Sequence, residues 1–268
     1  MSVYKNIGVI IPTRLGSSRL KKKSLIKVEG KALLAHLIDR LSRSKYIKRK
    51  NIIICTTKKN EDDLLVEEGD KNKVTVFRGD EKDIIKRYFD CAKKFGLDLI
   101  ISVNGDNPLT SIEHLDITIE KAIYINVNEK FIVTQKNLPL GCSSYVFNIN
   151  TLVKVYKNYM TKENDTGFIY FFTKTKLCKT LYIKEDKKIS HFKNVRLTVD
   201  YAEDVEVMKL IFKKFIQKKY FSIYELLDFL KIYSSILKLN EHLDNKYWQR
   251  TKDKSNLQYK YNNKITNI

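Results

Sequence analysis

Short apolar runs alternate with amphipathic segments in the first part of the chain, and this alternation constrains the fold more than any other feature of the sequence. The apolar runs have the length and the β-branched residues of buried strands, and the segments between them repeat apolar residues at helical spacing. The strand-like runs are residues 7–11, 51–55, 74–77 and 99–103, and the helical segments are residues 31–44, 61–68 and 82–95. Continuous apolar strands that alternate with helices favour a mainly parallel sheet with helices on both faces and right-handed crossovers. The sequence therefore predicts an α/β protein.

The loop after the first predicted strand is rich in cations and small residues. Pro12 ends that strand, because proline cannot continue a central ladder. The loop then contains Arg14, Gly16, Ser17, Ser18, Arg19, Lys21, Lys22 and Lys23. Small residues let backbone N–H groups close around an anion, and Arg and Lys neutralise its charge. The loop is therefore predicted to bind phosphate. The P-loop and dinucleotide-binding patterns are both absent, and a solvated basic turn is the alternative interpretation.

Two aspartates are expected to follow strands at the same edge of the sheet as this loop. Asp106 follows the run 99–103, and Asp200 follows a short predicted strand over 195–199. Ligands bind beyond the carboxyl ends of the strands in such sheets. Two carboxylates with open coordination positions suit Mg²⁺, and nucleotidyl transfer needs mainly positioning and neutralisation of phosphate charge. The alternatives are a turn residue for Asp106 and a helix N-cap for Asp200.

The rest of the chain is predicted to belong mostly to the same domain, residues 1–239. Further helices are expected over 111–122, 149–159, 201–215 and 222–237, and further strands over 131–134, 144–147, 177–183 and 195–199. The aromatic-rich segment 164–175 is either a subunit contact or part of the core. Residues 240–268 are polar and basic and have little apolar periodicity, so we expect a partly ordered C-terminal appendage.

The composition narrows the class of protein only loosely. Lys and Arg number 51 against 31 Asp and Glu, and the resulting net charge of +20 suggests an acidic partner. A non-catalytic nucleic-acid-binding protein is therefore one alternative, although the lysines are spread along the whole chain. The four cysteines form no CxxC pair and the four histidines show no ligand spacing, which indicates buried, reduced thiols rather than a zinc site or a disulfide framework. The sequence shows neither a signal peptide nor a membrane span, so a soluble, cytoplasmic protein without a membrane partner is expected.

Several segments resemble, in the same order, the cytidylyltransferases that activate acidic sugars. They read IPTRLGSSRLKKKSL, EGKALLAHLIDRL, VFRGDEKDIIKRY, VNGDNPLTS and RLTVDYAEDVEVMKLIF. The resemblance is closest to the SpsF-like branch of spore-coat polysaccharide synthesis, and CMP-Kdo and CMP-sialate synthetases are related to it. It implies a Rossmann-like nucleotide-diphospho-sugar transferase fold, a homodimer, Mg²⁺ dependence, and transfer of CMP from CTP to a sugar hydroxyl with release of pyrophosphate. Nucleic acid is not an expected partner of such an enzyme.

The resemblance also implies roles for individual residues. Asp106 and Asp200 match the metal ligands, and Arg14, Lys23 and Asp106 match the catalytic residues. The nucleotide-binding residues would be Pro12, Thr13, Arg14, Gly16, Ser17, Ser18, Arg19, Lys23, Arg78, Arg87 and Asp106. For Arg78 and Arg87, an ordinary surface position is the alternative.

The chain departs from the family pattern at two places. Lys21-Lys22 replace the usual Pro-Gly before the loop lysine, so any of three neighbouring lysines could meet the triphosphate, and Lys23 is the prediction. Tyr201-Ala202 replace the usual Thr-Pro after the second aspartate. A transferase of the same fold that uses another nucleotide or acceptor remains an alternative, whereas a glycosyltransferase would commonly show a D-x-D motif.

Overall fold

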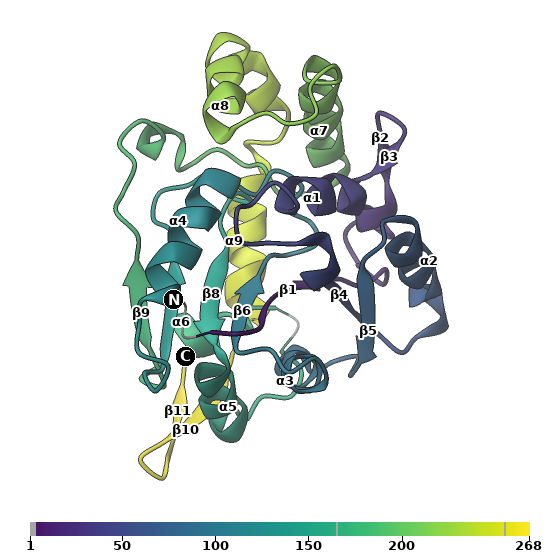
Figure 1. Ribbon diagram of the computed structural model, residues 1–268. Coiled ribbons are helices and arrows are strands. Elements are labelled where there is room, and N and C mark those ends of the chain that lie inside the picture. The colour runs from purple at the N-terminus through teal and green to yellow at the C-terminus, as the bar shows by residue number, and fades with distance from the viewer. Residues whose placement is uncertain (1–3, 165, 255) are drawn as a thin grey trace.

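A seven-stranded sheet forms the centre of the computed structural model, which describes residues 4–164, 166–254 and 256–268 (Figure 1). The strands are β1 (Ile7–Pro12), β4 (Ile52–Thr57), β5 (Thr75–Gly79), β6 (Leu99–Ser102), β7 (Phe131–Thr134), β8 (Tyr145–Asn148) and β9 (Lys179–Tyr182). Their order is β5-β4-β1-β6-β8-β7-β9. Only β8 is antiparallel to its neighbours in this sheet, within the described residues. The predicted mainly parallel sheet is therefore confirmed.

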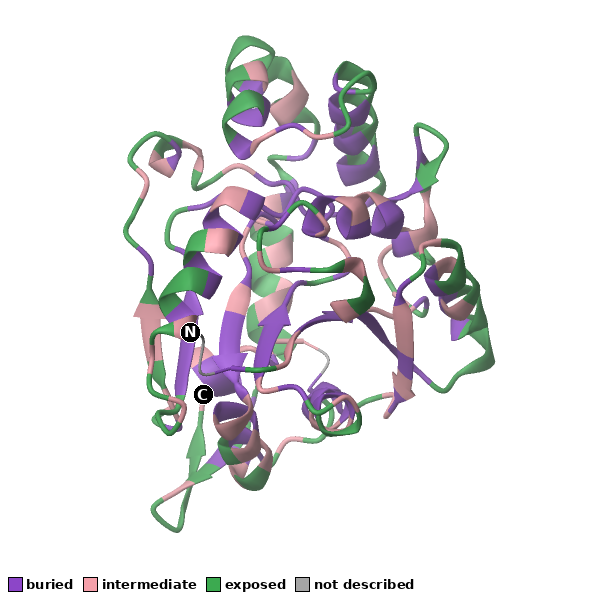
Figure 2. Cartoon of the chain, in the orientation of Figure 1, coloured by how far each residue is buried: buried purple, intermediate pink, exposed green. Residues whose placement is uncertain are grey.

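Helices cover both faces of the sheet, because successive side chains of a strand point to opposite sides. Val9 and Ile11 pack in one apolar cluster, and Ile10 between them packs in another. The first cluster lies under α1 (Leu33–Leu41), α2 (Asp63–Lys71) and α4 (Ile112–Ile123), and the second under α3 (Ile84–Lys94), α5 (Ile149–Asn158) and α6 (Tyr170–Thr173). Figure 2 shows the central strands as mostly buried between these layers.

The aromatic-rich segment packs in the core. Phe168, Phe171 and Phe172 are buried in the cluster under α3 and α5. Core packing is therefore confirmed for these side chains, while residue 165 of the segment lies outside the described residues. Cys55, Cys91 and Cys142 are buried free thiols as expected, but Cys178 is only partly buried.

A third apolar cluster lies beside the sheet, beneath α7 (Ala202–Lys214) and α8 (Ile223–Ile232) at the top of Figure 1. The helix predicted over 222–237 ends earlier than expected, and a 3₁₀ helix, η5 (Ser234–Leu239), continues the chain. The other short elements are the antiparallel pair β2 (Lys27–Val28) and β3 (Lys31–Ala32) and the 3₁₀ helices η1 (Lys23–Leu25), η2 (Arg49–Asn51), η3 (Asn60–Asp62) and η4 (Ser190–Phe192). None of the helices in the described part of the chain is long and apolar enough to span a membrane.

The strand predicted over 195–199 is absent, and the segment instead runs between two loops. Leu197 donates its N–H to the Leu140 carbonyl (2.7 Å), and Val199 donates to the Asp106 carbonyl (2.9 Å). Gly141 allows the close approach, because a Cβ there would lie 2.6 Å from the Leu197 backbone. The prediction was wrong because a short apolar run also fits an extended segment that is buried outside a sheet. The hydrogen bond from Val199 nevertheless holds the segment 195–199 against the loop that contains Asp106.

The C-terminal residues that the structure describes contain secondary structure, and part of it packs against the domain. They form α9 (Leu243–Lys254) and the hairpin of β10 (Gln258–Tyr261) and β11 (Lys264–Asn267). Leu257 and Tyr259 are buried in the cluster under α3 and α5, whereas β11 is exposed (Figure 2). The domain boundary after residue 239 stays a prediction.

Candidate active site

The loop after β1 begins against the ends of two neighbouring strands. Thr13 donates its N–H to the carbonyl of Cys55 on β4 (3.2 Å), and the Pro12 carbonyl accepts from the N–H of Gly105 after β6 (3.3 Å). Glycine is needed at this contact, because a Cβ on Gly105 would lie 2.7 Å from the Thr13 Cβ. Pro12 and Thr13 therefore hold the start of the basic loop against the loop that carries Asp106.

Leu15 anchors the middle of the basic loop. It is buried, its N–H donates to the Asp62 carboxylate (2.8 Å), and its carbonyl accepts from the Lys22 N–H (3.1 Å). Lys22 has a left-handed φ of 52°. This turn leaves Lys21 and Lys22 exposed, and the side chain of Lys23 is only 13% exposed.

Lys23 joins the two predicted metal ligands. Its Nζ donates to Asp106 Oδ2 (2.5 Å) and to Asp200 Oδ1 (2.7 Å), and Arg19 Nη2 lies 2.5 Å from the same Asp200 oxygen. The Asp200 side chain is only 2% exposed. The structure therefore brings together three segments that are far apart in the sequence, and Lys23 is the loop lysine that reaches the carboxylates.

These opposite charges stabilise one another in a buried place. Burial alone would raise the pKa of Asp200, but the Lys23 ammonium and the Arg19 guanidinium outweigh it and hold this pKa below its ordinary value. Burial alone would lower the pKa of Lys23, but Asp106 and Asp200 raise it above its ordinary value. Lys23 and Asp200 are therefore both charged at neutral pH.

A buried ion pair that the sequence reasoning missed holds Asp200 in place. Asp204 accepts the N–H groups of Asp200 (2.8 Å) and Tyr201 (3.0 Å). Arg196 donates Nε to Asp204 Oδ1 (2.8 Å) and Nη2 to Asp200 Oδ2 (3.3 Å). The sequence signal that could have revealed this ion pair is the spacing of Arg196, Asp200 and Asp204, which follow one another at intervals of four residues in the segment RLTVDYAED.

The small residues of the loop lie on its outer side. Gly16 is exposed, and a Cβ there would lie 2.7 Å from Glu61 Oε1. Ser17 and Arg14 are partly buried, and Ser18 is exposed with its hydroxyl within reach of Arg250 (3.3 Å). Their place between the start of the loop and Arg19 is compatible with the predicted phosphate cradle.

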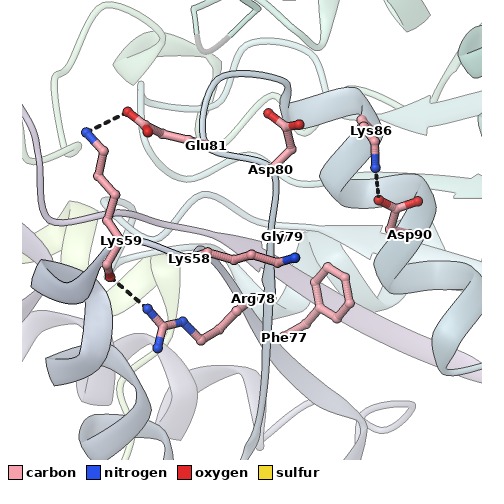
Figure 3. Close-up of a pocket in the computed structure, with 9 residues that line it drawn as sticks. All are labelled: Lys58, Lys59, Phe77, Arg78, Gly79, Asp80, Glu81, Lys86 and Asp90. Atoms are coloured by element: carbon pink, nitrogen blue, oxygen red, sulfur yellow. Dashed lines mark hydrogen bonds and ion pairs between the residues drawn. The ribbon is translucent and has the colours of Figure 1, made fainter.

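Arg78 and Arg87 lie apart from the carboxylate pair. Arg78 donates Nε to the Thr57 carbonyl (2.9 Å), and Arg87 donates Nη1 to the Asp80 carbonyl (3.0 Å). Arg87 is 1% exposed, so the surface alternative is wrong for it. Figure 3 shows Arg78 beside a cavity of about 440 Å³, lined by Lys58, Lys59, Phe77, Arg78, Gly79, Asp80, Glu81, Lys86 and Asp90. A nucleotide or sugar contact for either arginine stays a prediction.

Helix α9 also borders the site, which its polar sequence did not indicate. The centroid of the Tyr247 ring lies 4.9 Å from the guanidinium carbon of Arg196 and 5.9 Å from the guanidinium carbon of Arg19. Burial raises the pKa of Tyr247, and the charges of Asp200 and Asp106 add to this rise. The phenol is therefore neutral and lies near both carboxylates.

The carboxylate pair is the group best suited to a metal. Within the described residues, no cluster of three or more His, Cys, Asp and Glu side chains could hold an ion. Asp106 and Asp200 already direct one oxygen each at a single cation, the Lys23 ammonium. Two carboxylates fit Mg²⁺, which usually takes its other ligands from water and phosphate.

Comparison with known proteins decides the family. A family model described as cytidylyltransferase matches residues 8–249. The chain belongs to the cytidylyltransferase family. Cytidylyltransferases are transferases, so the chain belongs to a family of enzymes.

Similar proteins support this assignment. An uncharacterized protein of Methanocaldococcus jannaschii is 36% identical over 93% of this chain and 100% of its own. The spore coat polysaccharide biosynthesis protein SpsF of Bacillus subtilis is 28% identical over 78% of this chain and 87% of its own. A 3-deoxy-manno-octulosonate cytidylyltransferase of Francisella tularensis is 32% identical over 41% and 44%. Two of these three relatives are thus named for polysaccharide biosynthesis and for cytidylyl transfer to 3-deoxy-manno-octulosonate.

A solved structure agrees with the sequence relatives. The structure of a cytidylyltransferase from Leptospira borgpetersenii superposes with a TM-score of 0.75 at 28% identity, covering 87% of this chain and 96% of that one. The Rossmann-like nucleotidyltransferase fold implied by the sequence resemblance is therefore confirmed for this cytidylyltransferase.

Proposed function

We propose that this cytidylyltransferase transfers CMP from CTP to a hydroxyl of an acidic sugar and releases pyrophosphate. The observation that carries the proposal is the position of Lys23 between Asp106 and Asp200, beside a loop rich in cations. The names of its relatives support a sugar acceptor, because they include a polysaccharide biosynthesis protein and a 3-deoxy-manno-octulosonate cytidylyltransferase.

The reaction exchanges one phosphorus–oxygen bond for another. The acceptor oxygen forms a bond to the α-phosphorus of CTP, the bond from that phosphorus to the bridging oxygen breaks, and the hydroxyl proton passes to solvent. Asp106 and Asp200 would hold Mg²⁺, which when bound supplies positive charge next to the α-phosphate. Arg14, Arg19 and Lys23 stabilise the negative charge of the departing pyrophosphate.

Lys23 has to change partners during this cycle. Its ammonium lies between the two carboxylates in the structure. Phosphate oxygens are equally good acceptors for an ammonium group. We therefore propose that Lys23 leaves Asp106 and Asp200 for the triphosphate when CTP and Mg²⁺ bind.

A homodimer and a cytoplasmic location stay predictions.

The decisive experiment measures pyrophosphate release with CTP, Mg²⁺ and a panel of acidic sugars. Release is expected with at least one sugar, to be lost on removal of Mg²⁺ by a chelator, and to fall strongly in the Asp106→Asn variant. ATP, GTP and UTP serve as controls for the choice of base. If no sugar supports release and calorimetry detects no CTP binding, the proposal is wrong. Steeply salt-dependent binding of RNA or DNA would then favour the nucleic-acid-binding alternative.

A further inference from the structure

Helix α9 brings an arginine to the outer side of the basic loop. Arg250 donates Nη2 to the Ser18 hydroxyl (3.3 Å), across 232 residues of sequence. Ser18 is exposed and Arg250 is partly buried, so their contact lies near the surface of the protein. The guanidinium therefore lies next to the small residues that are expected to cradle phosphate.

The face of α9 that carries Arg250 is fixed against the carboxylate site. Tyr247, three residues before Arg250, packs against the guanidinium groups of Arg196 and Arg19. Asp244, three residues earlier again, lies with Oδ1 3.6 Å from Arg196 Nη1. Residues three apart lie on one side of a helix. Because Arg196 is fully buried, these contacts hold α9 in a defined position and Arg250 with it.

The positive charge of Arg250 is not paired with a carboxylate within the described residues, whereas the charges of Lys23 and Arg19 are. Lys23 is engaged by Asp106 and Asp200, and Arg19 is engaged by Asp200. Arg250 forms no ion pair within the described residues, and its recorded partner is a neutral hydroxyl. A guanidinium can bind two phosphate oxygens at once, and it binds them most strongly where no carboxylate competes.

We propose that Arg250 binds the terminal phosphates of CTP and the pyrophosphate that leaves, so that α9 forms one wall of the nucleotide site. This inference rests on the proposed function. The order of contacts supports the assignment to the terminal phosphates. Arg19 contacts Asp200, and Ser18, the residue before Arg19, contacts Arg250. Within the described residues Arg250 contacts neither Asp106 nor Asp200, and the α-phosphate is expected beside those two carboxylates.

Binding measurements on matched variants test the proposal. Calorimetry with Mg²⁺ present would compare CTP, pyrophosphate and CMP as ligands of the wild-type chain and of Arg250→Gln. The substitution is expected to weaken CTP and pyrophosphate binding by about tenfold, the loss of one charge-assisted contact, and to leave CMP binding unchanged. Lys254→Gln removes the same charge from an exposed position of α9 and is expected to bind all three ligands like the wild type.

The outcomes separate this inference from the proposed function. If the wild type binds CTP and pyrophosphate but Arg250→Gln binds them equally well, the inference is wrong and the function stands. If the wild type binds neither ligand, the proposed function fails and the inference with it. An equal loss for CMP would also overturn the assignment to the terminal phosphates. Should Arg250→Gln unfold, Arg250→Met carries the test, because it removes the charge and keeps an unbranched side chain, and unchanged affinity for CTP and pyrophosphate would overturn the proposal.

Discussion

Lys23 neutralises two carboxylates that would otherwise repel each other in a place with little access to water. Asp200 is almost fully buried, and a buried carboxylate is costly unless it is paired. The pair therefore depends on a cation in every state of the proposed cycle. In the structure that cation is Lys23, and Mg²⁺ is proposed to replace it in the complex with CTP.

The buried pair of Arg196 and Asp204 gives the first prediction, at the scale of single residues. Asp204→Asn keeps the shape of the side chain but leaves the Arg196 charge with a weaker partner, and both side chains are fully buried. We expect the free energy of unfolding to fall by about 3 kcal/mol, the usual effect of removing one member of a buried pair. Urea unfolding measures this change.

The neighbouring acid provides the control for this prediction. Glu203→Gln removes the same charge from an exposed position in the first turn of α7, so its effect is expected to stay within about 0.5 kcal/mol. Equal stability of the two variants would show that the Arg196–Asp204 contact does not hold the segment of Asp200.

Gly141 gives a prediction at the scale of elements. Its φ is 98°, and a Cβ would lie 2.6 Å from the backbone of Leu197. Gly141→Ala is therefore expected to push the segment 195–199 away from its neighbours, to lower the free energy of unfolding by about 3 kcal/mol, and to weaken CTP binding. Thermal unfolding and calorimetry measure the two effects.

Gly30→Ala separates the clash from backbone strain. Gly30 also has a positive φ, of 76°, but nothing lies within 4 Å of the position of its Cβ. This variant is expected to lose about 1 kcal/mol and to keep its affinity for CTP. If both alanine variants behave alike, the close packing at Gly141 has no special importance for the site.

The segment 195–199 also shows where sequence reasoning stops at this scale. Apolar runs located the strands of the sheet closely, because a strand between two helical layers needs a continuous apolar sequence. The same signal misassigned 195–199, whose partners are the loops at Leu140 and Asp106 rather than a neighbouring strand. Only the tertiary structure decides between these partners.

At the scale of the whole molecule, the sequence predicted the architecture and the meeting of Lys23, Asp106 and Asp200. The architecture and the approach of Lys23 to Asp106 follow from a general rule, since the carboxyl ends of parallel strands share one edge of the sheet. Asp200 reaches the same edge through the extended segment 195–199, which is not a strand of that sheet. The contribution of α9 could not be predicted in this way. Its contacts through Tyr247 and Arg250 depend on where the end of the chain returns, and a polar helix carries no pattern that specifies its partner.

The packing of C-terminal residues in the cluster under α3 and α5 gives the last prediction. Leu257, between α9 and β10, is fully buried in the cluster under α3 and α5. Leu257→Ala leaves a cavity there and is expected to lower the free energy of unfolding by about 3 kcal/mol. Ile265→Ala, at a 62% exposed position of β11, is expected to change it by less than about 0.5 kcal/mol. Urea unfolding compares the two variants. A large difference would show that the C-terminal residues are part of the folded core, and two near-neutral variants would show that they are an appendage after all.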